Sequence, residues 1–334
     1  MTSPTLTVLI SAKVVDQVQT AVQSQYALEN VRFVPYHGKR IDEETLKQID
    51  IAFVSRDVTG LSTKYVLEPH TETFYQMMED APRLQWVQVH SAGLDRPIYV
   101  RLREKGVKLT NASGALSSIV AQSVLTGVLA LNRRFRFLEN AQREHTWAPL
   151  LGELMPPDLE GQHVLLAGWG AIGQTIQRYL DMLGMRVTVL RNSEGGDDGH
   201  IPMIHYDNMQ SVLEQIDWLI LACPLTDRTR GLVSRHMLNA IKPGAHLVNV
   251  SRGEVVDETA MIAALKDGRL AGAYLDVFEK EPLQKDSPLW DMSNVIVSPH
   301  TAGHSAGNET RVSDIFLENL DNWVHGRPLR NLAR

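Results

Sequence analysis

Short apolar runs alternate with amphipathic stretches along most of the chain. Runs of this length, bounded by polar or turn-forming residues, predict buried parallel strands, and the stretches between them carry the spacing of helices. In the first third of the chain the predicted strands are residues 5–10, 31–36, 49–55, 84–90 and 107–111. This alternation predicts a small doubly wound α/β sheet.

A second series of apolar runs follows from residue 163 onward. Its predicted strands are residues 164–167, 186–190, 218–223, 246–250, 271–277 and 295–298. A helix predicted at 171–183 is ended by Gly184, and Asp257 is expected to cap a further helix that runs to Lys266. We therefore expect a second parallel sheet in a domain of its own.

Two long helical segments flank this second series. Residues 115–139 are expected to form one helix, with Arg133, Arg134 and Arg136 near its end, where the helix dipole favours positive charge. Its apolar positions cover a broad surface, which predicts a helix that bridges the domains and also faces another subunit. Residues 308–325 are predicted as an amphipathic helix that folds back onto the first domain.

Residues 163–173 run from an apolar strand into three glycines, Gly168, Gly170 and Gly173, with the spacing G-x-G-x-x-G. The spacing alone is a weak signal, but here a strand precedes it and a helix and a second strand follow. In such a unit Gly168 allows a tight turn, Gly170 lets a pyrophosphate approach the backbone, and Gly173 lets helix and strand pack closely. A glycine-rich turn without a ligand is the alternative. The context favours a dinucleotide site at the start of the helix.

Length, charge and cysteine content exclude several classes of protein. At 334 residues the chain is long for one core and predicts two domains, and a net charge of −6 argues against a nucleic-acid partner. The single cysteine, Cys223, cannot form an internal disulfide, which favours a reducing compartment. No basic region precedes the first apolar residues, and no apolar run approaches the roughly 18 residues of a membrane span. We expect a cytoplasmic enzyme that binds neither nucleic acid nor membrane.

Residues with catalytic potential follow the predicted strands of the second series, where ligands bind in open α/β sheets. Arg252 comes after the strand at 246–250. Asp276 lies at the end of the next predicted strand and Glu281 lies after it. His300 follows the strand predicted at 295–298. For each residue taken alone, an ordinary surface or turn position is the better interpretation. Together they bring a cation, carboxylates and a histidine to the place where a nicotinamide would lie.

Five segments resemble, in order and at family spacing, the signatures of the NAD(P)-dependent D-2-hydroxyacid dehydrogenases. They are Gly168-Trp-Gly170-Ala-Ile-Gly173, Pro224-Leu-Thr-Asp-Arg-Thr-Arg230, Val248-Asn-Val-Ser-Arg252-Gly-Glu-Val-Val-Asp257, Leu275-Asp-Val-Phe-Glu-Lys-Glu-Pro282 and Ser298-Pro-His300. Residues 91–95 (Ser-Ala-Gly-Leu-Asp) resemble the family's substrate-carboxylate loop. The resemblance implies a Rossmann-type doubly wound parallel sheet domain, residues 113–302, inserted into a smaller flavodoxin-like α/β substrate-binding domain, residues 1–112 and 303–334.

The resemblance also implies roles for single residues. Glu281 and His300 would form the acid/base pair, and Arg252 would hold the substrate. Ala92 and Gly93 would offer backbone N–H groups to the substrate carboxylate beside Arg252 and His300. The residues expected to bind the cofactor are Gly168, Gly170, Ala171, Ile172, Gly173, Arg191, Asn192, Ser193, Cys223, Pro224, Thr229 and Asp276. Asp276 would form a hydrogen bond with the nicotinamide carboxamide.

The chemistry of the catalytic side chains supports these roles independently. Reduction of a 2-keto acid needs a cation for the carboxylate and carbonyl groups, and the planar fork of Arg252 adds geometry to charge. It also needs a proton donor beside the carbonyl oxygen as hydride arrives. The carboxylate of Glu281 favours a protonated His300, which can donate that proton.

Arg191 indicates which nicotinamide cofactor is preferred. It lies 23 positions after Gly168, near the place where an NAD enzyme carries an acid for the ribose hydroxyl. Arginine can instead grip a 2′-phosphate, with Asn192 and Ser193 as neutral donors. An exposed arginine without a ligand is the alternative. We predict that NADP is preferred and NAD is possible, with the nearby acids Glu194, Asp197 and Asp198 directed to solvent.

The segments around Trp147 and at 287–291 most resemble the glyoxylate/hydroxypyruvate reductase branch. In some members of that branch a partner's tryptophan reaches the substrate mouth. For Trp147 this contact and an ordinary interface or core position both stay open. The resemblance and the helix at 115–139 predict a homodimer. A nucleotide-sensing binding protein of the corepressor type is the alternative function, which the fold alone does not exclude.

Three further residues are given lesser roles. His300 and His304 are four residues apart, but a third ligand is not evident, so no metal site is expected. Cys223 is expected to border the nicotinamide pocket as a small apolar residue, since no base is placed for it. His90 either lines the cleft beside the carboxylate loop or is a core or turn histidine.

Overall fold

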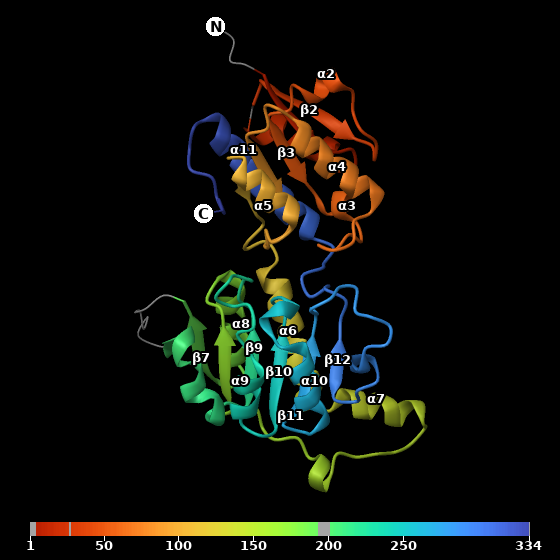
Figure 1. The fold of residues 1–334 in the computed structure, drawn as a ribbon, viewed down its shortest axis with the longest axis vertical. Helices are drawn as coiled ribbons and strands as arrows, with labels where there is room; N and C mark the ends of the chain where they lie inside the picture. The colour runs from red at the N-terminus through yellow and green to blue at the C-terminus, as the bar shows by residue number, and fades with distance from the viewer. Residues whose placement is uncertain (1–4, 27, 193–200, 334) are drawn as a thin grey trace. The chain divides into compact units, whose positions relative to one another are not determined.

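The computed structural model describes residues 5–26, 28–192 and 201–333 (Figure 1). The chain forms two compact units. One unit comprises Met1–Leu116 and Ser305–Arg334, and the other comprises Ser117–His304. The second unit is therefore inserted into the first along the chain. The substrate-binding role expected for the first unit stays a prediction.

The first unit is built on a five-stranded parallel sheet with the strand order β2-β1-β3-β4-β5. Its strands are β1 (Leu6–Ser11), β2 (Val31–Tyr36), β3 (Ile51–Val54), β4 (Trp86–Val89) and β5 (Lys108–Thr110). Its α-helices are α1 (Val15–Ala21), α2 (Glu43–Leu46), α3 (Arg56–Thr59), α4 (Pro69–Asp80), α5 (Pro97–Glu104) and α11 (Asn308–Val324), and a π-helical turn follows α1 at Val22–Tyr26. This strand order is that of flavodoxin-like sheets.

Helices cover both faces of this sheet (Figure 1). On one face, α4 and α5 bury Phe74 and Leu102 against the strands. On the other face, α11 places Phe316 in a stack on Phe53 with a ring-centroid distance of 4.5 Å. The last helix therefore belongs to the hydrophobic core of the first unit, as its amphipathic pattern predicted.

The second unit is built on a seven-stranded parallel sheet with the strand order β12-β11-β10-β9-β6-β7-β8. Its strands are β6 (His163–Ala167), β7 (Arg186–Arg191), β8 (Met203–His205), β9 (Trp218–Leu221), β10 (Ala245–Asn249), β11 (Leu270–Leu275) and β12 (Val295–Val297). Its α-helices are α6 (Ser117–Asn132), α7 (Phe135–Arg143), α8 (Ala171–Asp181), α9 (Arg235–Ala240) and α10 (Glu258–Lys266), with 3₁₀ turns at Gly152–Leu154, Tyr206–Gln215, Gly253–Val255 and Pro288–Trp290. This is the Rossmann order, in which the first strand lies beside the second and the fourth.

Both faces of this sheet are also covered. Val124 of α6 and Ile176 of α8 belong to one apolar cluster, and Leu238 of α9 and Met261 of α10 belong to another. The Asp257 side chain accepts a hydrogen bond from Ala260 N at 2.9 Å, which confirms the predicted helix cap. The predicted fold class, a Rossmann-type α/β sheet with a smaller α/β sheet, is confirmed.

The structure of the second unit differs from the predicted elements in three main respects. The single helix expected at 115–139 is two helices, because α6 ends at Asn132 and Arg134 adopts a left-handed backbone with φ 53°. Strand β8 was not predicted, since three half-buried residues carry too short a pattern. The strands expected at 218–223 and 271–277 end at Leu221 and Leu275, where the chain leaves the sheet and enters loops.

Candidate active site

The three predicted catalytic residues follow three neighbouring strands of the seven-stranded sheet. Arg252 comes after β10, Glu281 after β11 and His300 after β12. Since these strands are parallel and adjacent, the loops that carry the three residues lie at the same carboxyl edge. The fold of the second unit thus gathers groups that are up to 48 positions apart in the sequence.

His300 and Glu281 form a direct pair. His300 Nδ1 lies 2.8 Å from Glu281 Oε2, and the Glu281 side chain is 13% exposed while that of His300 is 48% exposed. The other carboxylate oxygen, Glu281 Oε1, accepts a hydrogen bond from Phe278 N at 3.2 Å. Because Nδ1 is hydrogen-bonded to Glu281, Nε2 is the ring nitrogen that can contact a reacting molecule.

Arg252 starts the turn that follows β10. Its Nη1 donates to the carbonyl of Ser251 at 2.7 Å, and the next residue, Gly253, packs against the backbone of Phe278 and Glu279. A Cβ at Gly253 would overlap the Phe278 carbonyl group, so only glycine fits there. The loop of Arg252 therefore rests directly on the segment that leads to Glu281. Gly253 was not among the predicted site residues, although a glycine directly after a strand-end arginine was a visible signal.

Asp276 lies at the end of β11 and is 2% exposed. Its Oδ1 accepts hydrogen bonds from Thr301 N at 2.8 Å and Ala302 N at 3.0 Å, and its backbone carbonyl accepts one from His300 N at 2.8 Å. The carboxylate thus holds the turn that carries His300. The expected bond from Asp276 to a nicotinamide carboxamide stays a prediction.

The glycine turn has the geometry that a dinucleotide site needs. Gly168 has φ +107°, and a Cβ there would lie 2.8 Å from Ala222 O. A Cβ at Gly173 would overlap the Gly168 carbonyl oxygen. At Gly170 the described residues leave open space within 4 Å, and α8 begins at the next residue, Ala171. The N–H groups of Ala171 and Ile172 stand in the first turn of α8, where backbone donors can meet a phosphate.

Arg191 is the last residue of β7 and is half-buried, with Nη1 3.2 Å from Met203 Sδ. Asn192 is exposed, and its carbonyl oxygen lies 3.0 Å from His205 Nε2. The third predicted donor, Ser193, and the acids Glu194, Asp197 and Asp198 lie outside the described residues. The structure therefore places Arg191 at the strand end beside the glycine turn, with Gly168 N bonded to Leu190 O at 2.9 Å.

The loop after β9 carries Cys223, Pro224 and Thr229. Thr229 is buried and donates from Oγ1 to Pro224 O at 2.6 Å, so its hydroxyl shapes the loop itself. Cys223 is buried beside Gly168, and burial raises the pKa of its thiol to about 11. A thiol with this pKa stays protonated at neutral pH, which favours the expected role as a small packing residue.

The predicted carboxylate loop follows β4 in the first unit. Ser91 Oγ donates to Gly93 O at 2.8 Å, and Asn111 Nδ2 donates to Ala92 O at 2.9 Å. Within the described ranges, the backbone N–H groups of Ala92 and Gly93 make no hydrogen bond, so they remain available to an anion. His90 Nε2 lies 2.9 Å from Thr59 Oγ1, which ties the strand end to α3.

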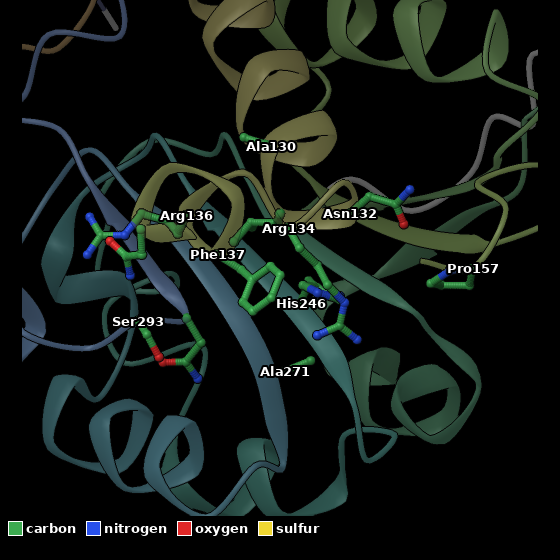
Figure 2. Close-up of a pocket in the computed structure, with 12 residues that line it drawn as sticks. Ala130, Asn132, Arg134, Arg136, Phe137, Pro157, His246, Ala271 and Ser293 are labelled. Carbon is green, nitrogen blue, oxygen red and sulfur yellow. The ribbon is translucent and has the colours of Figure 1, made fainter. Parts of the chain in front are cut away.

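A cavity of about 300 Å³ lies elsewhere in the second unit (Figure 2). Figure 2 shows the Phe137 ring between Arg134, on the side of His246, and Arg136, on the side of Ser293. His246 is near the start of β10, whereas Arg252 follows the end of that strand, so the cavity lies at the opposite edge of the sheet from the catalytic residues. Among residues 5–26, 28–192 and 201–333 no group of histidine, cysteine and carboxylate side chains could hold a metal ion. In the same ranges, every helix is too short or too polar to cross a membrane.

Comparisons with known proteins point to one family. Residues 125–302 match the family model described as D-isomer specific 2-hydroxyacid dehydrogenase, NAD binding domain. A glyoxylate reductase from Korarchaeum cryptofilum is 31% identical over 262 residues, which cover 77% of this chain and 78% of that protein.

Two solved structures share the fold over nearly the whole chain. A D-isomer specific 2-hydroxyacid dehydrogenase from Xanthobacter autotrophicus, in complex with NADPH and MES, has a TM-score of 0.78 and 28% identity, covering 99% of this chain and 98% of its own. An NADPH-dependent glyoxylate/hydroxypyruvate reductase from Sinorhizobium meliloti, in complex with NADP and sulfate, has a TM-score of 0.75 and 25% identity, covering 98% of each chain.

Proposed function

Because the chain belongs to the D-isomer specific 2-hydroxyacid dehydrogenases, we propose that it reduces glyoxylate, hydroxypyruvate or a related small 2-keto acid and prefers NADPH. The observation that carries the proposal is the pair of His300 Nδ1 and Glu281 Oε2 at 2.8 Å. A histidine held in this way by a carboxylate is suited to transfer a proton from its other nitrogen. The relatives named as reductases favour an enzyme over a nucleotide-sensing binding protein.

The proposed reaction adds a hydride to C2 of the keto acid and a proton to its carbonyl oxygen, which yields the 2-hydroxy acid, as the D-isomer where C2 becomes a stereocentre. When bound, the reduced nicotinamide supplies the hydride. His300 Nε2 donates the proton, and Glu281 stabilises the protonated ring and fixes its orientation. In the reverse direction the same nitrogen accepts the proton from the hydroxyl group.

Arg252 binds and polarises the substrate in this proposal. Its guanidinium would bond the carboxylate and the carbonyl oxygen together, which orients C2 and stabilises the negative charge that develops on the oxygen. In the first unit, the N–H groups of Ala92 and Gly93 make no hydrogen bond to any described residue, which supports their proposed role as donors to an anion. A guanidinium that binds the carboxylate selects 2-keto acids over simple ketones.

Three features support the cofactor assignment. The open space at Gly170 and the first turn of α8 fit a pyrophosphate. Arg191 stands at the end of β7 where an acid would select NAD. The similar structure from Xanthobacter autotrophicus contains NADPH. NAD is then the weaker cofactor.

We also propose that the protein is a homodimer and that it acts in the cytoplasm. Trp147 is 95% exposed, and Leu151 and Met155 of the same segment are also exposed. An apolar surface of this kind favours contact with a second subunit, with α6 and the segment around Trp147 at the interface. Light scattering at micromolar concentration should give the mass of two chains, and a mass of about one chain would contradict this part.

The test of the function is NADPH oxidation by the purified enzyme with glyoxylate, hydroxypyruvate and phenylpyruvate, each repeated with NADH. We expect turnover with at least one 2-keto acid and a higher kcat/KM with NADPH. A simple ketone such as acetone serves as the control without a carboxylate. Cofactor binding without turnover of any keto acid would instead support the binding-protein alternative.

A further inference from the structure

A chain of buried and half-buried hydroxyl groups ends on the turn that carries His300. Ser298 Oγ lies 2.6 Å from Asp276 Oδ1 and 3.0 Å from the Tyr274 hydroxyl oxygen. Tyr274 is buried on β11, the second strand from one edge of the sheet, and Asp276 lies two residues further along the chain. None of the hydroxyl groups of Tyr274 and Ser298 takes part in the proposed reaction.

The number of protons on each group determines which group donates in each hydrogen bond of this series. Asp276 Oδ1 already accepts from two backbone N–H groups, those of Thr301 and Ala302, so it acts as an acceptor toward Ser298 as well. Serine has one hydroxyl proton, and when that proton is donated to Asp276 the oxygen can only accept from Tyr274. Burial above all raises the pKa of Tyr274, which keeps its hydroxyl protonated and able to donate.

The chain also reaches helix α6. Ser123 Oγ donates to Ala302 O at 2.8 Å, which holds the same turn from its other side. The Tyr274 ring lies against Gly127 of α6, where a Cβ would come within 2.6 Å of the ring carbon Cγ. Glycine at this position is therefore what allows the helix to approach the tyrosine.

The turn held by these contacts places His300 in an uncommon conformation. His300 has φ +50°, in the left-handed region that residues other than glycine rarely adopt. A residue keeps such a backbone conformation only when contacts with the surrounding structure hold it there. Here Asp276 bonds three successive residues of the turn, through His300 N, Thr301 N and Ala302 N.

We propose that Tyr274, Ser298 and Ser123 are positioning residues that act through Asp276 and Ala302 to keep His300 aligned on Glu281. This inference rests on the proposed role of His300 as the proton donor. A hydroxyl network of purely structural value would lower the melting temperature when it is cut and leave turnover unchanged. A positioning network lowers kcat, because a displaced donor transfers its proton poorly.

The experiment compares Ser298→Ala and Tyr274→Phe with Ser298→Thr, which keeps the hydroxyl, and with His300→Ala. In each variant kcat, the KM for NADPH and the melting temperature are measured on the full-length enzyme. We expect Ser298→Ala to lose about tenfold in kcat, Tyr274→Phe less, and Ser298→Thr to recover most of the loss, with the KM for NADPH within about twofold. Thr188→Val, which removes a buried hydroxyl that contacts His163 at 2.8 Å, is the matched control and should keep its kcat.

The outcomes separate the two proposals. Wild-type kcat in folded Ser298→Ala and Tyr274→Phe, with an inactive His300→Ala, overturns the positioning network and leaves the proposed function standing. Full turnover in His300→Ala overturns the proposed function itself. Equal losses of kcat in Thr188→Val and Ser298→Ala also overturn the network, because any buried hydroxyl would then have the same effect.

Discussion

Gly253 and Phe278 touch through their backbones, so closely that any side chain at Gly253 would overlap the Phe278 carbonyl. This contact joins the loop of Arg252 to the segment that leads to Glu281. Gly253→Ala should therefore force the two loops apart, destabilise the protein by about 3 kcal/mol or more, and lower kcat. Thermal unfolding and steady-state kinetics measure both effects. Gly268→Ala, where the added Cβ meets open space at φ +78°, should cost only the roughly 1 kcal/mol of a strained backbone.

Arg252→Ala should lower kcat/KM for the keto acid by at least about a hundredfold, because the substrate loses its bidentate cation. Arg252→Lys should not restore activity, since a point charge cannot bond carboxylate and carbonyl together. Arg269→Lys, which alters an arginine that donates to Asn239 O at 2.9 Å, serves as the control. Near-wild-type turnover of Arg252→Lys would show that charge alone suffices.

His300→Ala should lose about 10²- to 10⁴-fold in kcat, the usual contribution of a general acid. Glu281→Gln should also lower kcat, by less than His300→Ala, because the ring keeps a hydrogen-bond partner but loses the carboxylate that orients it. Steady-state kinetics measure both losses, with His325→Ala as an exposed-histidine control. A wild-type kcat in Glu281→Gln would show that Glu281 has no part in the reaction.

Arg191→Asp should reverse the cofactor preference from NADPH to NADH. The change removes the cation for the 2′-phosphate and adds a repelling charge, while a carboxylate can accept from the ribose hydroxyl of NADH. The ratio of kcat/KM values for the two cofactors is the measurement. Arg186→Asp, at the first residue of the same strand, should leave the ratio unchanged. Equal ratios in Arg191→Asp and wild type would refute the phosphate site.

His246 should make the stability of the protein depend on pH. Burial first, and then the charge of Arg134, lower the pKa of His246 to about 4, against about 6.5 when unfolded. The unfolded state then binds more protons between these values, so the free energy of unfolding decreases as pH falls from about 6.5 to 4, by at most about 3 kcal/mol.

His246→Phe tests this, because phenylalanine can keep the stack on Trp218, whose ring centroid lies 4.3 Å away, and cannot titrate. Denaturant unfolding at about pH 7 and about pH 5 should show a smaller loss of stability in the variant than in the wild type. The exposed His236→Phe should behave like the wild type. The same loss in His246→Phe and wild type would assign the pH dependence to other groups.

Much of the molecule follows from local patterns in the sequence. The alternation of apolar runs and amphipathic stretches predicts the parallel strands except β8, and it predicts helices α8, α10 and α11, because each strand buries both faces and each helix buries one. The spacing of Gly168, Gly170 and Gly173 predicts the tight turn, and a Cβ at Gly168 or Gly173 would indeed collide with neighbouring backbone atoms. The strand-end positions of Arg252 and His300 predict a shared edge, because parallel strands end together.

Contacts between distant residues were decided only by the tertiary structure. The break between α6 and α7 has no proline or glycine to mark it, and it follows from the left-handed Arg134. The bond from Ser123 to Ala302 joins residues 179 positions apart, and the close approach of Gly253 to Phe278 joins two separate loops. Such contacts depend on how the helices, strands and loops pack in space, so the local sequence around each residue does not predict them.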